Sequence, residues 1–197
     1  MFDRNYIYPL KSDNTSTWAY LTNYFTKDEC ARIIQLGQEL VGIEANLGFE
    51  HQTDNEIRKT TVAFFDPKQG SVQWIFDRIK TISQSINQQF WNFDLRFIEC
   101  IQFTQYNKSG DFYTSHMDMR YNSIEVRKLS ISVQLSDSDD YNGCDLELLT
   151  YGNNSFAAPR AQGTVIAFPS YHLHRVTPLV SGTRYSLVAW IVGPPFR

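Results

Sequence analysis

Apolar residues recur at helical intervals in two stretches of the amino-terminal half of the chain. The first stretch follows residues 26–29, TKDE, which have the spacing of a capping box, and it predicts a helix that ends at Gly42. The second predicts a helix over about residues 71–90, with one apolar stripe that packs against a sheet. The polar residues 43–59 predict a loop, and TTVAFFD after it predicts a strand that ends at Pro67.

Short runs rich in β-branched and aromatic residues dominate the chain from Phe93 onward, and turn-forming residues separate them as they separate strands. The runs are FDLRFIECIQFTQY, KLSISVQLSD, CDLELLTY, GTVIAFPS and TRYSLVAWIVG. From Leu129 to Leu135 apolar residues alternate strictly with Ser and Gln, which predicts a strand with one buried face. The sequence contains no repeat or linker. We therefore expect one domain, with helices and loops in residues 1–92 and strands in residues 93–197.

The composition allows a substantial buried core, because 42% of the residues are hydrophobic and 15% are aromatic. The charge is slightly negative, with 18 basic and 21 acidic residues, and gives no electrostatic reason to expect binding to nucleic acid or to a membrane surface. Three dispersed cysteines form no CxxC pair, and no stretch reaches the roughly 20 apolar residues of a membrane span. These features predict a cytoplasmic protein.

Histidines and an aspartate near strand ends have the spacing of metal ligands. His116 and Asp118 project from the same face of an extended segment and can reach one ion, although the pair alone also fits a solvated turn. His172 and His174 follow the strand GTVIAFPS, and either can supply a third ligand. Two imidazoles and a carboxylate on one face of an octahedral ion leave three positions open, which suits iron(II) that activates oxygen. Cys144 is an alternative fourth ligand for a closed zinc site, but a lone buried thiol is the commoner interpretation.

Arg184 offers the fixed cation that a dicarboxylate bound to such a metal needs, because a guanidinium binds a carboxylate through two hydrogen bonds. In RYSLVAW it shares a face with Ser186 and Trp190, so a hydroxyl donor lies next to the guanidinium. A surface salt bridge for Arg184 and core packing for Trp190 are the alternative interpretations. Tyr106 and Tyr113 precede the metal-binding pair, and either hydroxyl can bond the chelating oxygens, although tyrosines are also common at strand edges.

Together these residues resemble the prolyl 4-hydroxylase-like branch of the iron(II)/2-oxoglutarate-dependent dioxygenases. The family pattern of a Tyr, a Gly, a second aromatic residue and H-x-D is similar to Tyr106, Gly110, Tyr113, His116 and Asp118. The segments RKLSISVQLSDSDDYNGCDLEL and FPSYHLHRVTPLVSGTRYSLVAWIVGP resemble the strand and hairpin of the family and the segment that carries its distal ligand. The resemblance covers roughly the last hundred residues.

This resemblance implies a mainly β fold with flanking helices, in which a double-stranded β-helix, or jelly roll, is braced by amino-terminal helices. By the alignment of motifs the distal ligand is His174, ten residues before Arg184, and His172 lies outside the metal site. The implied Fe(II) ligands are therefore His116, Asp118 and His174.

The resemblance also implies a reaction, in which 2-oxoglutarate and molecular oxygen serve to hydroxylate a C–H bond. Succinate and carbon dioxide are the co-products, and ascorbate is an optional cofactor. The implied 2-oxoglutarate contacts are Arg184, Ser186 and Tyr106. The candidate substrate contacts are Tyr113, Arg127 and Trp190, and the loop over residues 43–59 is a candidate lid.

A prolyl residue in a peptide or protein is the leading substrate hypothesis, and it is supported mostly by analogy. One alternative keeps the iron and 2-oxoglutarate but hydroxylates a free amino acid or another small molecule. A second alternative is a cupin-like module that binds a metal or ligand without turnover. Cupins usually carry more histidines in their metal motifs than the four in this chain. The sequence gives no prediction of oligomeric state.

Overall fold

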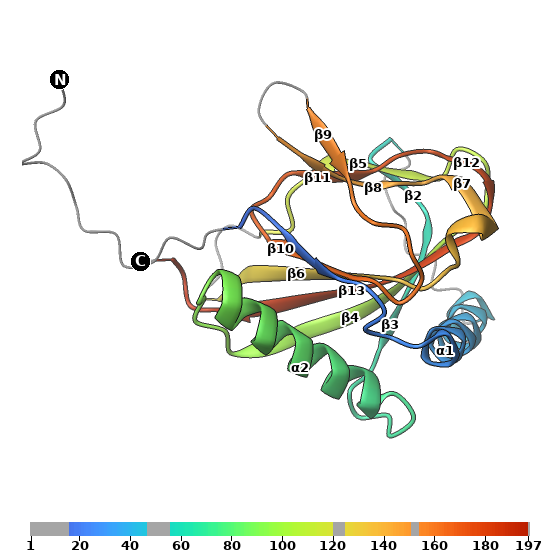
Figure 1. The fold of residues 1–197 in the computed structure, drawn as a ribbon. Helices are drawn as coiled ribbons and strands as arrows, with labels where there is room; N and C mark the ends of the chain where they lie inside the picture. The colour runs from blue at the N-terminus through green and yellow to red at the C-terminus, as the bar shows by residue number, and fades with distance from the viewer. Residues whose placement is uncertain (1–15, 47–55, 120–124, 151–153, 197) are drawn as a thin grey trace, which may run out of the picture.

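Two antiparallel sheets face each other in the computed structural model (Figure 1), which describes residues 16–46, 56–119, 125–150 and 154–196. The larger sheet has six strands, and its spatial order brings sequence-distant segments together. In that order the strands are β1 (Ala19–Leu21), β10 (Val165–Pro169), β6 (Val126–Gln134), β13 (Arg184–Gly193), β4 (Phe97–Tyr106) and β3 (Thr61–Phe65). Each of the runs that predicted a strand contributes one to this sheet or to the one facing it.

The smaller sheet has five short strands and lies over the larger one in Figure 1. In spatial order they are β2 (Arg58–Lys59), β5 (Phe112–His116), β11 (His174–Val176), β8 (Leu146–Leu149) and β9 (Ser155–Ala157). A further two-stranded pairing joins β7 (Tyr141–Gly143) to β12 (Leu179–Gly182), after a short 3₁₀ helix over Ser138–Asp140. Several of these strands have only two or three residues, too few for a periodic pattern in the sequence.

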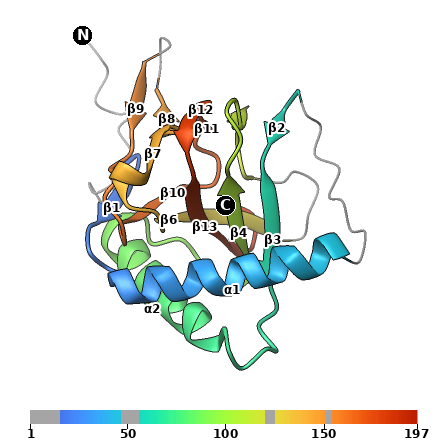
Figure 2. The same cartoon turned by 90° about the vertical axis from the view of Figure 1, so that its right-hand side faces the viewer.

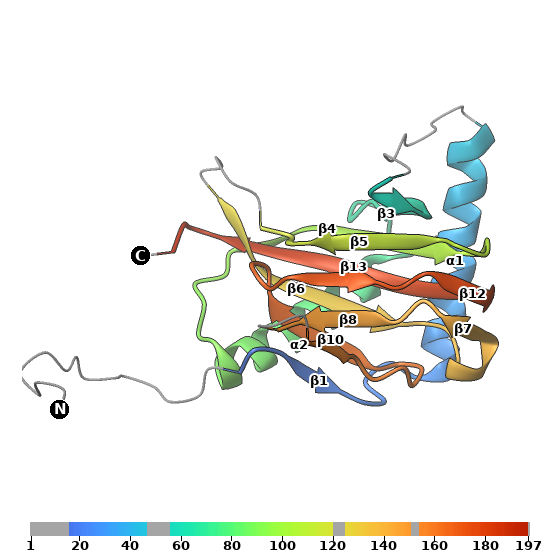
Figure 3. The same ribbon diagram turned by 90° about the horizontal axis from the view of Figure 1, so that it is seen from above.

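Two helices cover the outer face of the larger sheet, as Figures 2 and 3 show from two further directions. They are α1 (Lys27–Asn46), which runs across the strands, and α2 (Gln73–Phe90). The predicted capping box is present, since Glu29 N–H donates to Thr26 Oγ1 at 3.1 Å and Thr26 N–H donates to Glu29 Oε2 at 2.8 Å. The predicted second helix is confirmed within two residues.

The predicted end of the first helix at Gly42 is wrong, because α1 continues to Asn46. A glycine inside a helix costs only about 1 kcal/mol relative to alanine, which the good helix formers around it offset. The prediction of a loop over residues 43–59 is wrong at both ends. Helix α1 includes its first four residues, and its last two form the strand β2, which pairs with β5. Residues 47–55, which make up most of the candidate lid, lie outside the described residues.

The strand β6 has two buried faces, whereas the sequence predicted one. The apolar residues Leu129, Ile131 and Val133 have no exposed area and belong to the cluster that packs under the helices. The polar residues Ser130, Ser132 and Gln134 are also at most 5% exposed. The smaller sheet covers this polar face. The alternation of residues along one strand does not show that a second sheet packs on its polar side. The polar face is therefore the floor of an interior space.

Helix α1 lies in direct contact with the larger sheet. A Cβ atom at Gly37 would lie 2.4 Å from the ring of Phe103, closer than real side-chain contacts allow. The absence of a side chain at Gly37 therefore permits this close approach. Helices and strands share one apolar cluster, in which Phe25 and Ile75 from the helical half pack with Ile131 from the strand half.

No helix among the described residues is long and apolar enough to cross a membrane. The three cysteines, all described, form no disulfide with one another; Cys30 and Cys144 are buried, whereas Cys100 is partly exposed.

Candidate metal centre and ligand pocket

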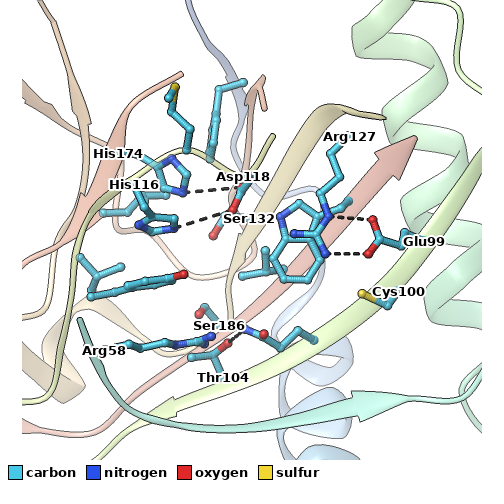
Figure 4. Close-up of a pocket in the computed structure, with 18 of the residues that line it drawn as sticks. Arg58, Glu99, Cys100, Thr104, His116, Asp118, Arg127, Ser132, His174 and Ser186 are labelled. Atoms are coloured by element: carbon cyan, nitrogen blue, oxygen red, sulfur yellow. Dashed lines mark hydrogen bonds and ion pairs between the residues drawn. The ribbon is translucent and has the colours of Figure 1, made fainter. Parts of the chain in front are cut away.

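Neighbouring strands of the smaller sheet bring His116, Asp118 and His174 together. His116 is the last residue of β5, and His174 is the first residue of β11, directly opposite it in the antiparallel register. Asp118 follows β5 by two residues. Its Oδ1 lies 3.7 Å from His116 Nε2 and its Oδ2 lies 3.6 Å from His174 Nε2 (Figure 4). One ligand atom from each of the three lies within 4.8 Å of the other two, close enough to share one ion.

Backbone carbonyls orient both imidazole rings toward Asp118. The Nδ1 of His116 lies 2.7 Å from the carbonyl oxygen of Thr114, and the Nδ1 of His174 lies 3.0 Å from the carbonyl oxygen of His172. A carbonyl only accepts hydrogen bonds, so each Nδ1 carries the proton and each Nε2 keeps a free lone pair. His172 thus acts on this site through its backbone, and its own ring is not part of the group.

The carboxylate of Asp118 is held by a buried hydroxyl. Ser130 Oγ, on the polar face of β6, donates to Asp118 Oδ2 at 2.6 Å and lies 2.9 Å from Ser170 Oγ. Asp118 is only 8% exposed, so this bond fixes the orientation of its oxygens in a site with little water. Hydrogen bonds to a carboxylate, like this one from Ser130 to Asp118, orient the ligands of metal sites and tune the metal.

The electrostatics of the group favour a neutral imidazole at His116. Burial lowers the pKa of His116 to about 4, and the neighbouring His174 adds to this effect. The ring of Tyr113 stacks on His116 with 3.6 Å between ring centroids and 19° between planes. Neutral imidazole is the form that ligates a metal.

The donor set fits an open, oxygen-activating metal site. Two imidazole nitrogens and one carboxylate are the only His, Cys, Asp or Glu donors that gather in this way among the described residues. Cys144 is fully buried in a different, apolar cluster with Tyr141 and Leu146, so the closed zinc site considered from sequence lacks its fourth ligand. An ion held here keeps coordination positions for exogenous ligands, as in the two-histidine-one-carboxylate iron(II) sites.

A cavity of about 430 Å³ opens between the two sheets beside these three residues. Its walls include inward-facing residues of β4 and β13, and Figure 4 shows Thr104 and Ser186 on the side away from His174. Thr104 and Ser186 are opposite each other in the register of these strands. The cavity has the size of a typical small-molecule site.

Arg184 lies fully inside the protein, with an exposed fraction of 1%, and it lines the cavity. Its Nη2 donates to Gln134 Oε1 at 2.9 Å, while its Nε is buried without a hydrogen-bond partner. It forms no ion pair with any residue in the described ranges, which excludes the surface salt bridge considered from sequence. The guanidinium lies 5.5 Å above the ring of Tyr106, its register partner on β4. Ser186, two residues along β13, is 2% exposed on the same wall.

The three candidate substrate contacts also line the cavity. Arg127 donates twice to the carboxylate of Glu99, each bond 2.7 Å long, and its guanidinium lies 4.0 Å above the ring of Trp190. Trp190 is 8% exposed and its buried Nε1 has no hydrogen-bond partner, so it forms cavity wall as well as core. Tyr113 is held on the opposite side by its stack with His116.

Two charged residues of the cavity wall, Glu99 and Arg58, were missed by the sequence reasoning. Glu99 is an ordinary polar position in a long predicted strand, and only its partner Arg127 gives it meaning. Arg58 lies in the stretch that was predicted to be loop, where a two-residue strand leaves no pattern. Strict alternation would place Glu99 on the same side as the core residues Ile101 and Phe103, whereas an irregularity in the pairing of β4 with β13 turns it to the cavity. Nothing in the sequence around Arg58 indicates its position.

The sequence of residues 101–192 matches the 2OG-Fe(II) oxygenase superfamily. The chain resembles the 2OG-Fe(II) oxygenases. This match confirms the resemblance on which the sequence reasoning relied, and it contains all three residues of the candidate metal centre together with Arg184. Because the matched segment starts inside β4 and ends inside β13, it covers most of both sheets but neither helix and none of β1, β2 and β3.

Curated relatives of the chain are PKHD-type hydroxylases. That of Synechococcus sp. strain CC9605 is 38% identical over 85 residues, which cover 43% of this chain and 38% of the relative. That of Synechococcus sp. strain CC9311 is 30% identical over 119 residues, which cover 57% of this chain and 53% of the relative. The chain thus spans about two fifths to one half of the length of these relatives.

Solved structures with the same fold are prolyl hydroxylases. The Pseudomonas putida prolyl-4-hydroxylase superposes with a TM-score of 0.69 at 20% identity, covering 89% of this chain and 91% of that one. The viral collagen prolyl hydroxylase of Paramecium bursaria Chlorella virus-1, in its 2OG complex, has a TM-score of 0.69 at 17% identity, covering 90% and 97%. These likenesses confirm the predicted double-stranded β-helix with flanking helices.

Proposed function

We propose that this chain is an iron(II)- and 2-oxoglutarate-dependent dioxygenase that hydroxylates a C–H bond. The observation that carries the proposal is the convergence of His116, Asp118 and His174 beside a cavity whose wall holds the buried Arg184. A metal that keeps open positions and a fixed cation for a dicarboxylate are the two requirements of this chemistry. The match to the 2OG-Fe(II) oxygenases supports the same assignment.

The residues of the chain divide the work as follows. His116, Asp118 and His174 hold Fe(II), and the carbonyls behind the histidines keep each Nε2 aimed at it. Arg184 and Ser186 bind the far carboxylate of 2-oxoglutarate, and Tyr106 lies next to them. Iron(II) supplies the redox chemistry that couples oxidation of 2-oxoglutarate by O₂, with loss of carbon dioxide and formation of succinate, to hydroxylation of the substrate. The enclosing sheets exclude water from it.

The proposed substrate is a prolyl residue of a peptide or protein. The cavity wall presents the aromatic rings of Tyr113 and Trp190 and the guanidinium of Arg127. Such groups can pack against a proline ring and hydrogen-bond the adjacent peptide group. The solved prolyl hydroxylase of Trichoplax adhaerens is in complex with a peptide fragment of a hypoxia inducible factor, and it shares this fold with a TM-score of 0.70 at 16% identity.

Two measurements test the proposal. Anaerobic addition of Fe(II) and 2-oxoglutarate should give a weak visible charge-transfer band, and Arg184→Ala should lose it at concentrations that saturate the parent. The control is Arg96→Ala, which removes an arginine whose side chain is 53% exposed and lies far from the metal ligands in sequence. Binding of 2-oxoglutarate to Arg184→Ala with parental affinity would contradict the role of this residue.

The substrate is tested by product analysis. In air, with ascorbate present, succinate should accumulate together with a mass increase of one oxygen atom on a proline-containing peptide from a panel. Oxygen incorporation into a free amino acid, with none into any peptide, would assign a small-molecule substrate instead. Absence of succinate under every condition, with metal bound, would leave a ligand-binding module without turnover.

A further inference from the structure

Arg58 lies in the cavity although it belongs to a strand of only two residues. Strand β2 pairs with β5, and this register places Arg58 opposite Tyr113. The guanidinium lies 4.7 Å from the centroid of the Tyr113 ring, which in turn stacks on His116. The Nε of Arg58 is buried and has no hydrogen-bond partner among the described residues. Stacking on Tyr113 thus positions Arg58, and its Nε–H is left to bind another group.

The charges of the cavity wall are unbalanced around this residue. Three arginines line the cavity, and Arg127 is neutralised by its two-bond pair with Glu99. Within the described ranges neither Arg58 nor Arg184 has a carboxylate at ion-pairing distance. A cation withdrawn from water without a partner is unfavourable, so the buried Arg184, with the partly buried Arg58 on the same cavity, favours an anionic ligand there.

Both unpaired arginines act on the same region of the cavity. Burial raises the pKa of Tyr106 to about 12, and positive charge opposes this rise, with Arg58 contributing more than Arg184. Tyr106 is the register partner of Arg184. Figure 4 shows the Arg58 side chain near Ser186 and Thr104 and apart from the metal-binding group, and all line the same cavity. Arg58 thus points to the Arg184 end of the cavity.

We propose that Arg58 is a second arginine for the far carboxylate of 2-oxoglutarate, which it clamps together with Arg184. This inference rests on the proposed function. A carboxylate offers about four lone-pair sites on two oxygens, enough for a guanidinium on each side and for the hydroxyl of Ser186. The consequence is selectivity, because a 2-oxo acid that lacks the far carboxylate leaves the buried Arg184 and the partly buried Arg58 without this partner.

The experiment compares two ligands that differ only in that carboxylate. Binding of 2-oxoglutarate and of 2-oxopentanoate to the Fe(II)-loaded protein is titrated without oxygen, by the charge-transfer band and by calorimetry. Arg58→Gln should weaken 2-oxoglutarate binding by about 10- to 100-fold, as expected for loss of a charge-assisted bond. It should leave 2-oxopentanoate binding near the parental value. Arg58→Lys should retain part of the selectivity, because lysine keeps the positive charge but cannot form the two parallel hydrogen bonds of a guanidinium.

The controls separate this role from a structural one. Lys59→Gln removes a cation from the next residue, which is exposed, and should leave both affinities unchanged. Thermal unfolding and Fe(II) affinity of Arg58→Gln should match those of the parent protein. Equal weakening of both ligands by Arg58→Gln would overturn the proposal, since Arg58 would then serve only to position Tyr113. Unchanged affinity for 2-oxoglutarate would overturn it as well.

The proposed function fails in a different way. If the Fe(II)-loaded parent protein binds neither 2-oxo acid, the assignment as a 2-oxoglutarate-dependent enzyme falls, and the role of Arg58 falls with it. If the parent binds 2-oxoglutarate and only the Arg58 variants behave unlike the prediction, the enzyme assignment stands and the second arginine is rejected.

Discussion

The two faces of the larger sheet are both buried, yet they differ in chemistry. On β6 the side that faces the helices carries Leu129, Ile131 and Val133, and the side that faces the smaller sheet carries Ser130, Ser132 and Gln134. On the helix side these three residues belong to one apolar cluster. On the cavity side the hydroxyls and amides bind one another, the candidate metal ligand Asp118 and the cation Arg184.

This difference separates stability from function within single strands. Apolar burial on the helix side supplies the largest favourable term in folding, whereas a hydrogen bond between buried polar groups contributes only about 1 kcal/mol of net stability. Changes on the helix side should therefore lower stability and spare ligand binding. Changes on the cavity side should weaken ligand binding and leave stability nearly unchanged. A variant that lowers both stability and ligand binding would contradict this division.

The largest effect is expected at the cavity side, from His174→Ala. Loss of a group that only hydrogen-bonds a metal ligand lowers metal affinity by roughly 10- to 100-fold. Removal of one of the three proposed ligands should lower Fe(II) affinity by more than that. His172→Ala should largely spare metal binding, because the carbonyl that orients His174 remains in the backbone. Calorimetric titration of the metal-free proteins with Mn(II) or Fe(II) measures both. The reverse result would move the third ligand to His172.

The next effect belongs to the helix side, from Ile131→Ala. Ile131 has no exposed area in the core under the helices, and its truncation should lower the free energy of unfolding by about 2–5 kcal/mol. Val180→Ala, at a side chain that is 59% exposed, should change it by less than about 0.5 kcal/mol. Urea denaturation gives these values. The folded Ile131→Ala protein should bind metal with parental affinity, and weaker binding would show that the two faces are coupled.

The helix side was readable from the sequence, because its signals are local. The capping box at Thr26 and the apolar stripe of residues 71–90 report helices whose partners need not be known. The boundary at Gly42 was misplaced, since one glycine does not stop a helix whose following residues favour it. The alternation from Leu129 onward correctly predicted the strand.

The cavity side was readable only in part, because it depends on pairing between distant segments. The spacing of His116 and Asp118 and the resemblance to a family indicated the site. The register that places His174 opposite His116 arises from a strand of three residues, too short to be seen in the sequence. The same limit hid Arg58 on β2, and it also hid that the serines of β6 are buried.

A smaller effect is expected for Ser130→Ala on the cavity side. The variant removes the hydroxyl that donates to Asp118 Oδ2 at 2.6 Å and should lower metal affinity by about 10-fold or somewhat more. Ser132→Ala is a matched control, since it removes a hydroxyl from the same face of the same strand that does not bond Asp118. Metal titration of both variants provides the comparison. Equal losses in the two would show that the effect comes from general loosening of the face.

The smallest effect is expected at the start of α1, from Thr26→Ala. This variant breaks the capping box that bonds Thr26 and Glu29 in both directions, and it should lower the free energy of unfolding by about 1 kcal/mol. Thr81→Ala, on the exposed side of α2, should cost less than about 0.5 kcal/mol by the same urea measurement. Because α1 lies on the helix side of the sheet, where Gly37 approaches Phe103, metal affinity should stay at the parental value. A loss of affinity in Thr26→Ala alone would show that helix packing sets the geometry of the cavity, which contradicts the division between the two faces.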